Sequence, residues 1–329
     1  MKRWRLFFLI VALLSGENAH AVSCTTQSQM TEAQRSVYVQ AIHSLASNVQ
    51  SGNVAAVKSA TIAGVAAHFD GIAGTIQSVS PQLQGATITI EAIYSLKATD
   101  LHAPADAQFF CSGPGSQMLI TISIPQLPPG DYALALTRAT GIKQPQQISM
   151  ILANDPAGSE QWKLAGFFVR PLTFAAHDGV WYWTQARNYA AKKQQWNAYF
   201  YYQTAAYLLA PVDFLSSPNL EKLQKEMNAV RPAGLPDNAE PMKLAGNGQV
   251  FNITSLHTDG SLGGLDLVAN YTTDNVSDPV AARSRNLEVM KALIAQHPEL
   301  REAFHGLWIY ANAPHQQPYA IELPMNQIQ

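Results

Sequence analysis

Apolar residues alternate with polar residues through much of the chain between positions 86 and 168. Such a period of two is typical of antiparallel strands with one buried face. Gly- and Pro-rich clusters such as Gly113-Pro114-Gly115 separate the runs and supply turns. The alternating runs cover residues 88–96, 118–124, 132–136, 148–152 and 162–168. We therefore predict a meandering antiparallel sheet in this region.

The residues before this region follow helical spacing instead. Thr31 with Gln34 three residues later forms a capping-box pattern, and apolar residues then recur at mostly helical intervals up to Ser51. Two further helices are predicted over 54–60 and 62–79. Helices followed by a sheet predict an α+β domain over residues 25–172.

Small and aromatic residues recur at helical spacing in the middle of the chain. They predict two helices, each with one face of such residues, joined by a polar turn over 192–195. Pro211 ends the second helix, and Ser217-Pro218 begins a third over 219–230. The residues that form the two faces are Tyr182, Ala186 and Tyr189, and Ala198, Tyr202 and Ala205. This helical part is predicted to cover residues 173–231.

The last part of the chain is predicted to be a small α+β domain over residues 249–329. Residues 232–248 are rich in Pro, Gly and Asn and lack periodicity, so we expect a linker there. Asp278-Pro279 opens a helix between two pairs of alternating runs. These runs cover 250–257, 265–271, 307–311 and 319–323. The expected order is ββαββ.

The central helix pair resembles a tetratricopeptide (TPR) repeat, a helix–turn–helix unit of about 34 residues. The match includes the small and aromatic positions and the terminal Pro211, which stands one place late, while Tyr182 replaces the favoured Trp. In TPR proteins the first helix lines a peptide-binding groove. The resemblance implies that Trp183 and Arg187 face a protein or peptide partner. The alternative is that Trp183 anchors a core or a domain interface and that Arg187 is solvated.

The order of elements in residues 25–172 resembles the NTF2-like cone, in which a curved sheet wraps around helices and leaves a pocket. That fold houses both binding modules and enzymes, so the resemblance alone does not decide the function. An immunoglobulin-like sandwich that starts near Ala86 is the alternative.

The composition narrows the class of protein. Hydrophobic residues make up 47% and charged residues 13% of the 329 residues, which excludes a disordered chain. The formal net charge of −2 without basic clusters argues against nucleic acid as a partner. No segment of the mature chain approaches 18 unbroken apolar residues, so no transmembrane segment is predicted. The oligomeric state stays open.

Residues 1–21 have the pattern of a secretory signal peptide. Basic Lys2, Arg3 and Arg5 precede an apolar run over 6–14, and Ala19-His20-Ala21 is a small-x-small cleavage site. We expect cleavage after Ala21 and a secreted or periplasmic protein.

The two cysteines, Cys24 and Cys111, are expected to form one disulfide in an oxidising compartment. The alternative is a lipoprotein, because Ala21-Val22-Ser23-Cys24 faintly resembles a lipobox. The usual Leu of that box is missing.

Candidate chemistry is sparse. His68 and Asp70, two residues apart, are the nearest pattern to a catalytic dyad, but a surface His and an Asp that ends a helix turn are the favoured interpretation. The remaining histidines, His305 among them, lack ligand spacing, so neither a metal site nor a cofactor is predicted. We therefore expect a non-catalytic binding or scaffolding protein of the cell envelope. The alternative is a small-ligand-binding protein or an enzyme that uses a pocket inside the cone.

Overall fold

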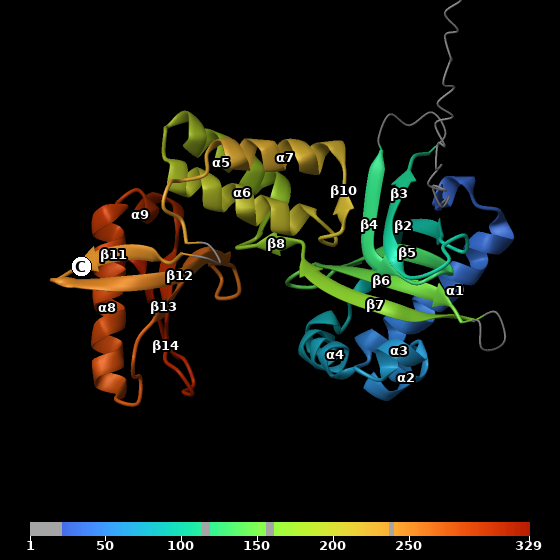
Figure 1. Ribbon diagram of the computed structural model, residues 1–329, viewed down its shortest axis with the longest axis horizontal. Helices are drawn as coiled ribbons and strands as arrows, with labels where there is room; N and C mark the ends of the chain where they lie inside the picture. Colours follow the sequence, from blue (N-terminus) through green and yellow to red (C-terminus); the bar gives the residue numbers. More distant parts are fainter. Residues whose placement is uncertain (1–21, 114–118, 156–160, 237–239) are drawn as a thin grey trace, which may run out of the picture.

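The computed structural model describes residues 22–113, 119–155, 161–236 and 240–329. Helices and mostly antiparallel sheets alternate along the chain, which confirms the predicted mixed α+β class. In Figure 1 three helices lie between the amino-terminal sheets on one side and the carboxy-terminal sheet on the other. The predicted signal peptide, residues 1–21, lies outside the described residues. Nowhere in the described ranges is a helix both long and apolar enough to cross a membrane.

Helices follow the first strand of the described chain. They are α1 (Glu32–Gln50), α2 (Val54–Ser59), α3 (Ala63–Ala66) and α4 (Asp70–Leu83). The capping box of α1 is confirmed, because Thr31 Oγ1 accepts a 3.2 Å bond from Gln34 N and Gln34 Oε1 accepts a 3.1 Å bond from Thr31 N. The single helix predicted over 62–79 is wrong. The chain turns between α3 and α4 and buries Phe69, where glycines on both sides weaken a continuous helix.

A five-stranded antiparallel sheet follows in the order β1-β2-β5-β6-β7. Its strands are β1 (Ser23–Thr26), β2 (Thr87–Lys97), β5 (Asp131–Thr140), β6 (Gln146–Asn154) and β7 (Trp162–Pro171). A three-stranded sheet has the order β10-β4-β3, with β3 (Ala105–Cys111), β4 (Ile120–Leu127) and β10 (Leu215–Ser216). The five alternating runs all fall in strands, although Met118 of one run lies outside the described residues.

The five-stranded sheet is covered on both faces. Because side chains alternate across a strand, Ile93 and Ala135 pack with the helices, whereas Leu96 and Leu134 pack with the three-stranded sheet. Strands β5 and β6 are accordingly buried along most of their length.

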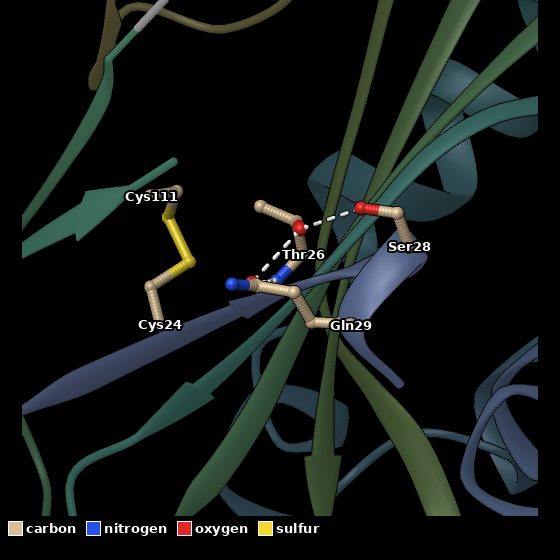
Figure 2. Close-up of a disulfide and its surroundings, with 5 residues drawn as sticks. All are labelled: Cys24, Thr26, Ser28, Gln29 and Cys111. Atoms are coloured by element: carbon tan, nitrogen blue, oxygen red, sulfur yellow. Dashed lines mark hydrogen bonds between the residues drawn. A yellow bond between two sulfur atoms is a disulfide. The ribbon is translucent and has the colours of Figure 1, made fainter. Parts of the chain in front are cut away.

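A disulfide between Cys24 and Cys111 joins the two sheets, as predicted (Figure 2). Cys24 lies in β1 of the larger sheet and Cys111 ends β3 of the smaller sheet. Their Cα atoms are 5.2 Å apart although the residues are 87 positions apart in the sequence. The bridge therefore fixes the first described strand to a sheet that it does not belong to.

The central helices are α5 (Gly179–Ala191), α6 (Gln195–Leu209) and α7 (Pro218–Ala229). Their bounds agree with the predicted helix pair, its turn and the third helix. A two-stranded ribbon of β8 (Thr173–Phe174) and β9 (His177–Asp178) leads into α5. Ala186, Ala198 and Ala205 are fully buried, so the backbones of α5 and α6 approach closely there.

The carboxy-terminal sheet has the order β11-β12-β13-β14-β15, and only β13 and β14 run parallel among its described strands. Its strands are β11 (Met242–Gly246), β12 (Gln249–Asp259), β13 (Asp266–Thr272), β14 (Gly306–Asn312) and β15 (Tyr319–Pro324). Helix α8 (Pro279–Gln296) and the short α9 (Leu300–Ala303) connect β13 to β14. Strand β11 corrects the expectation of an irregular linker over 232–248, since the last third of that stretch pairs with β12.

Helix α6 is buried almost all round because the carboxy-terminal part packs against it as well. Tyr201 Oη donates a 2.6 Å bond to the carbonyl of Ala303, and Asn197 Nδ2 donates a 2.7 Å bond to the carbonyl of Glu299. Thr204 on α6 also bonds to Thr258 of β12. The helices and the carboxy-terminal sheet thus share one hydrophobic core.

Candidate functional site

Trp183 and Arg187, the predicted partner-binding residues, both contact the side chain of Glu226 on α7. The indole Nε1 of Trp183 donates a 2.7 Å bond to Glu226 Oε2. Arg187 donates through Nε and Nη2 to the two carboxylate oxygens, at 2.8 Å each. The guanidinium also lies 4.6 Å from the centre of the Trp183 ring, and Tyr202 adds a 3.2 Å bond to Oε2. The structure therefore brings the two predicted residues together, but around a partner within the chain.

This cluster has strong electrostatic coupling. The hydrogen bonds from Arg187, followed by that from Trp183, lower the pKa of Glu226 to about 2 against the opposing effect of burial. Burial, and then the charge of Glu226, raise the pKa of Tyr202 to about 12. Because the carboxylate is ionised at neutral pH, it holds α7 against α5 and α6. A partner that binds Arg187 has to compete with Glu226.

The weak catalytic candidates do not converge on a site. His68 lies in the turn between α3 and α4, and Asp70 is the first residue of α4. Both side chains are exposed, on either side of the buried Phe69. The two side chains are therefore not held together around one site, and they lack the burial that tunes the pKa of an acid–base pair.

A groove of about 600 Å³ lies between α6, α7 and the end of β7. That volume is within the range of ligand sites. Its walls combine apolar residues with a small number of charged ones. The lining residues are Arg170, Ala206, Tyr207, Ala210, Val212, Asp213, Leu215, Ser216, Leu220, Glu221, Gln224 and Lys225.

Arg170 is held in the groove by three contacts. Its Nη1 donates a 2.9 Å bond to the carbonyl of Ala210, and its guanidinium lies 5.1 Å from the centre of the Tyr207 ring. Nη2 forms a 2.6 Å ion pair with Asp213. The side chain of Arg170 is only 13% exposed, whereas that of Asp213 is 91% exposed. The cation is thus fixed by the fold, and its carboxylate partner is free to move into solvent.

A pair of aromatic rings, one on β7 and one just before β10, lies next to residues that line the groove. The Phe168 ring lies 5.4 Å from that of Phe214 in an edge-on arrangement, and Phe168 and Tyr207 are each more than a third exposed. The helical part of the sequence is rich in aromatic residues, and Tyr207 is one of them. Arg170 lies next to the end of β7, directly before Pro171, and no pattern in the sequence singles it out.

No family model matches the chain, and comparison with curated proteins and with solved structures gives no match either. The function is therefore argued from the geometry of this chain.

Proposed function

We propose that this is a non-catalytic binding or scaffolding protein of the cell envelope that holds a segment of a partner protein in the Arg170 groove. The observation that carries the proposal is the asymmetry of the Arg170–Asp213 pair. A nearly buried guanidinium, oriented by Ala210 and Tyr207, has a carboxylate partner that is almost fully exposed. Preorganised cations of this kind suit the recognition of a second carboxylate.

The groove indicates the chemistry of the partner segment. Because Asp213 is almost fully exposed, an incoming carboxylate that takes its place keeps Arg170 paired and returns Asp213 to water. Beside Arg170 the wall is formed by the apolar side chains of Ala206, Val212 and Leu220. We infer a segment in which an acidic residue stands next to an apolar or aromatic one.

The location in the envelope rests on two supports. The amino-terminal sequence has the pattern of a signal peptide, and the Cys24–Cys111 disulfide fits an oxidising compartment. In the same proposal, α5 to α7 act as a TPR-like unit and the first domain as an NTF2-like support. The buried alanines at the α5–α6 contact support the first of these assignments.

Site-specific photo-crosslinking in the native envelope tests the proposal. A photoreactive residue at Gln224, which is exposed in the groove, should give a discrete adduct with one protein. The same residue at Lys291 on α8, a position half-exposed and remote from the groove, should not. Absence of an adduct, or the same adduct from both positions, would contradict the proposal.

Two substitutions of the ion pair sharpen the test, because they are expected to act in opposite directions. Arg170→Gln removes the cation and should abolish the adduct from Gln224. Asp213→Asn removes the competing carboxylate and should increase its yield. If both variants, shown to be folded, lower the yield equally, the groove does not bind through Arg170.

A further inference from the structure

Two carboxylates and an imidazole meet at one end of the carboxy-terminal sheet, away from the groove. Asp266 is the first residue of β13, His305 directly precedes β14, and Glu322 lies in β15. His305 Nδ1 lies 3.0 Å from Asp266 Oδ1. One ligating atom from each residue lies within 4.8 Å of the other two. These are three of the side-chain types that bind divalent cations.

The carboxylates of Asp266 and Glu322 have few hydrogen-bond donors or positive charges near them among the described residues. Asp266 is fully buried, yet its Oδ2 has no hydrogen-bond partner among the described residues. Glu322 Oε1 is buried and lacks a partner in the same part of the chain. Within the described ranges neither carboxylate forms an ion pair with a lysine or arginine. Burying ionised oxygens in this way is costly unless a positive charge is bound nearby.

Neighbouring residues add to the negative charge. The register of β12 and β13 places Asp259 directly opposite Asp266, and Asp259 is engaged by the backbone N of Ser261 at 2.7 Å. Asp259, Asp266 and Glu322 thus bring three carboxylates to this end of the sheet, and a bound cation would offset their charge.

Two glycines make room for the cluster. A Cβ on Gly306 would lie 2.7 Å from Glu322 Oε1 and 3.0 Å from Asp266 Oδ1. A Cβ on Gly264 would lie 2.4 Å from the Cβ and Cγ atoms of His305. Any larger residue at these two positions would push the ligating groups apart. Glycine at both positions therefore allows Asp266, His305 and Glu322 to lie close together.

We propose that Asp266, His305 and Glu322 bind a divalent transition cation, Zn²⁺ or Mn²⁺, through two carboxylates and one imidazole. The imidazole favours these ions over Ca²⁺ and Mg²⁺, which prefer oxygen ligands alone. The side chain of His305 is half-exposed, so a fourth position of the ion is open to solvent. Three protein ligands with one open position are typical of accessible zinc sites.

Small side-chain shifts suffice to form the site. Tetrahedral ligands at 2.0–2.2 Å from zinc are about 3.4 Å apart. The Asp266–His305 pair, at 3.0 Å, is already closer than this, and Glu322 has to approach by at most about 1.4 Å. On binding, the ion takes the place of the direct contact between His305 Nδ1 and Asp266 Oδ1. That contact alone is the competing explanation, but it satisfies only Oδ1 of Asp266 and leaves Oδ2 without a partner among the described residues.

The three ligands come from the start of β13, from the residue before β14 and from β15, which are far apart in the sequence. The expectation of no metal site followed from the lack of ligand spacing among the histidines, and such spacing detects only ligands that are close together in the sequence. The proposal goes beyond the binding of a partner protein and stands independently of it.

Calorimetric titration of the mature chain, residues 22–329, with ZnCl₂ and with MnCl₂ after treatment with a chelator tests the site. We expect one equivalent of cation to bind and to raise the unfolding temperature. Glu322→Gln and His305→Gln should each lower the affinity at least tenfold. His68→Gln, which removes an exposed histidine elsewhere, should leave it unchanged.

A measurement on the wild-type chain covers the case in which the variants do not fold. Paramagnetic Mn²⁺ should broaden the amide NMR signals of Gly306 and Leu265 before those of the first domain. Failure of both ions to bind, binding with wild-type affinity in His305→Gln and Glu322→Gln, or broadening that starts elsewhere would overturn the proposal.

Discussion

Arg187 holds Glu226 through two parallel hydrogen bonds of 2.8 Å, one to each carboxylate oxygen. The pair joins the first helix of the central part to its third helix. Fork-shaped pairs of this kind are stronger and more directional than single-contact ion pairs. Trp183 also donates to Glu226. The carboxylate of Glu226 therefore holds both residues that were predicted to face a protein or peptide partner.

Glu226→Gln should destabilise the protein by about 1–3 kcal/mol, because it weakens the charge-assisted bonds from Trp183 and Arg187. Urea unfolding of the variant and of the wild type measures the difference. Glu221→Gln is the matched control on the same helix, at an exposed position, and should change stability by less than about 0.5 kcal/mol. Equal losses in the two variants would show that the pair contributes nothing specific.

The stabilisation by Glu226 should depend on pH. The pKa of this carboxyl falls from 4.5 to about 2 in the folded protein. Its contribution is therefore complete above about pH 5 and is lost as the pH falls from about 4.5 toward 2. The difference in unfolding free energy between wild type and Glu226→Gln should shrink over that window. A difference that stays constant down to pH 2 would contradict the assignment.

Loss of the disulfide should destabilise the protein by about 2–5 kcal/mol, since the bridge closes a long loop in the unfolded chain. Urea unfolding of Cys24→Ala/Cys111→Ala measures the loss. Reductant should lower the stability of the wild type to the same extent and leave the double variant unaffected. Sensitivity of the double variant to reductant would indicate a different cause.

Tyr201→Phe should cost about 0.5–2 kcal/mol, because it leaves the carbonyl of Ala303 without the 2.6 Å bond from the tyrosine hydroxyl. It should also speed limited proteolysis within residues 173–211, where α6 loses its anchor on α9. The matched control is Tyr207→Phe on the same helix, whose side chain is partly exposed and which should have little effect. Faster cleavage in the control than in Tyr201→Phe would argue against this anchor.

The local signals in the sequence predicted most elements well. Thr31 and Ser217 lie at the positions of the helix caps because capping depends on neighbouring residues alone. Strand β3 escaped prediction because alanines fill two of its inward positions, and β11 because it lies in a Pro- and Gly-rich stretch. Both strands are fixed by their pairing partners, which local patterns do not contain.

The candidate sites were harder to predict than the elements. Arg170 and Tyr207 come together only when the end of β7 packs beside α6, and Asp266 meets Glu322 only when the strands of the last sheet align. Such contacts depend on the register of strands that are distant in sequence. The NTF2-like and TPR-like resemblances stay predictions, as does the division into domains at residues 172 and 232.

Helix α6 is a stiff rod of roughly 22 Å, at about 1.5 Å per residue, and its two ends serve different neighbours. Near its start, Asn197 and Tyr201 are bonded to the segment around α9, and near its end Tyr207 borders the groove. A rod of packed side chains does not bend to accommodate a local push. A ligand that tilted α6 at Tyr207 would therefore strain the hydrogen bonds that Asn197 and Tyr201 make to the segment around α9. Binding in the groove would in this way affect the carboxy-terminal part of the chain.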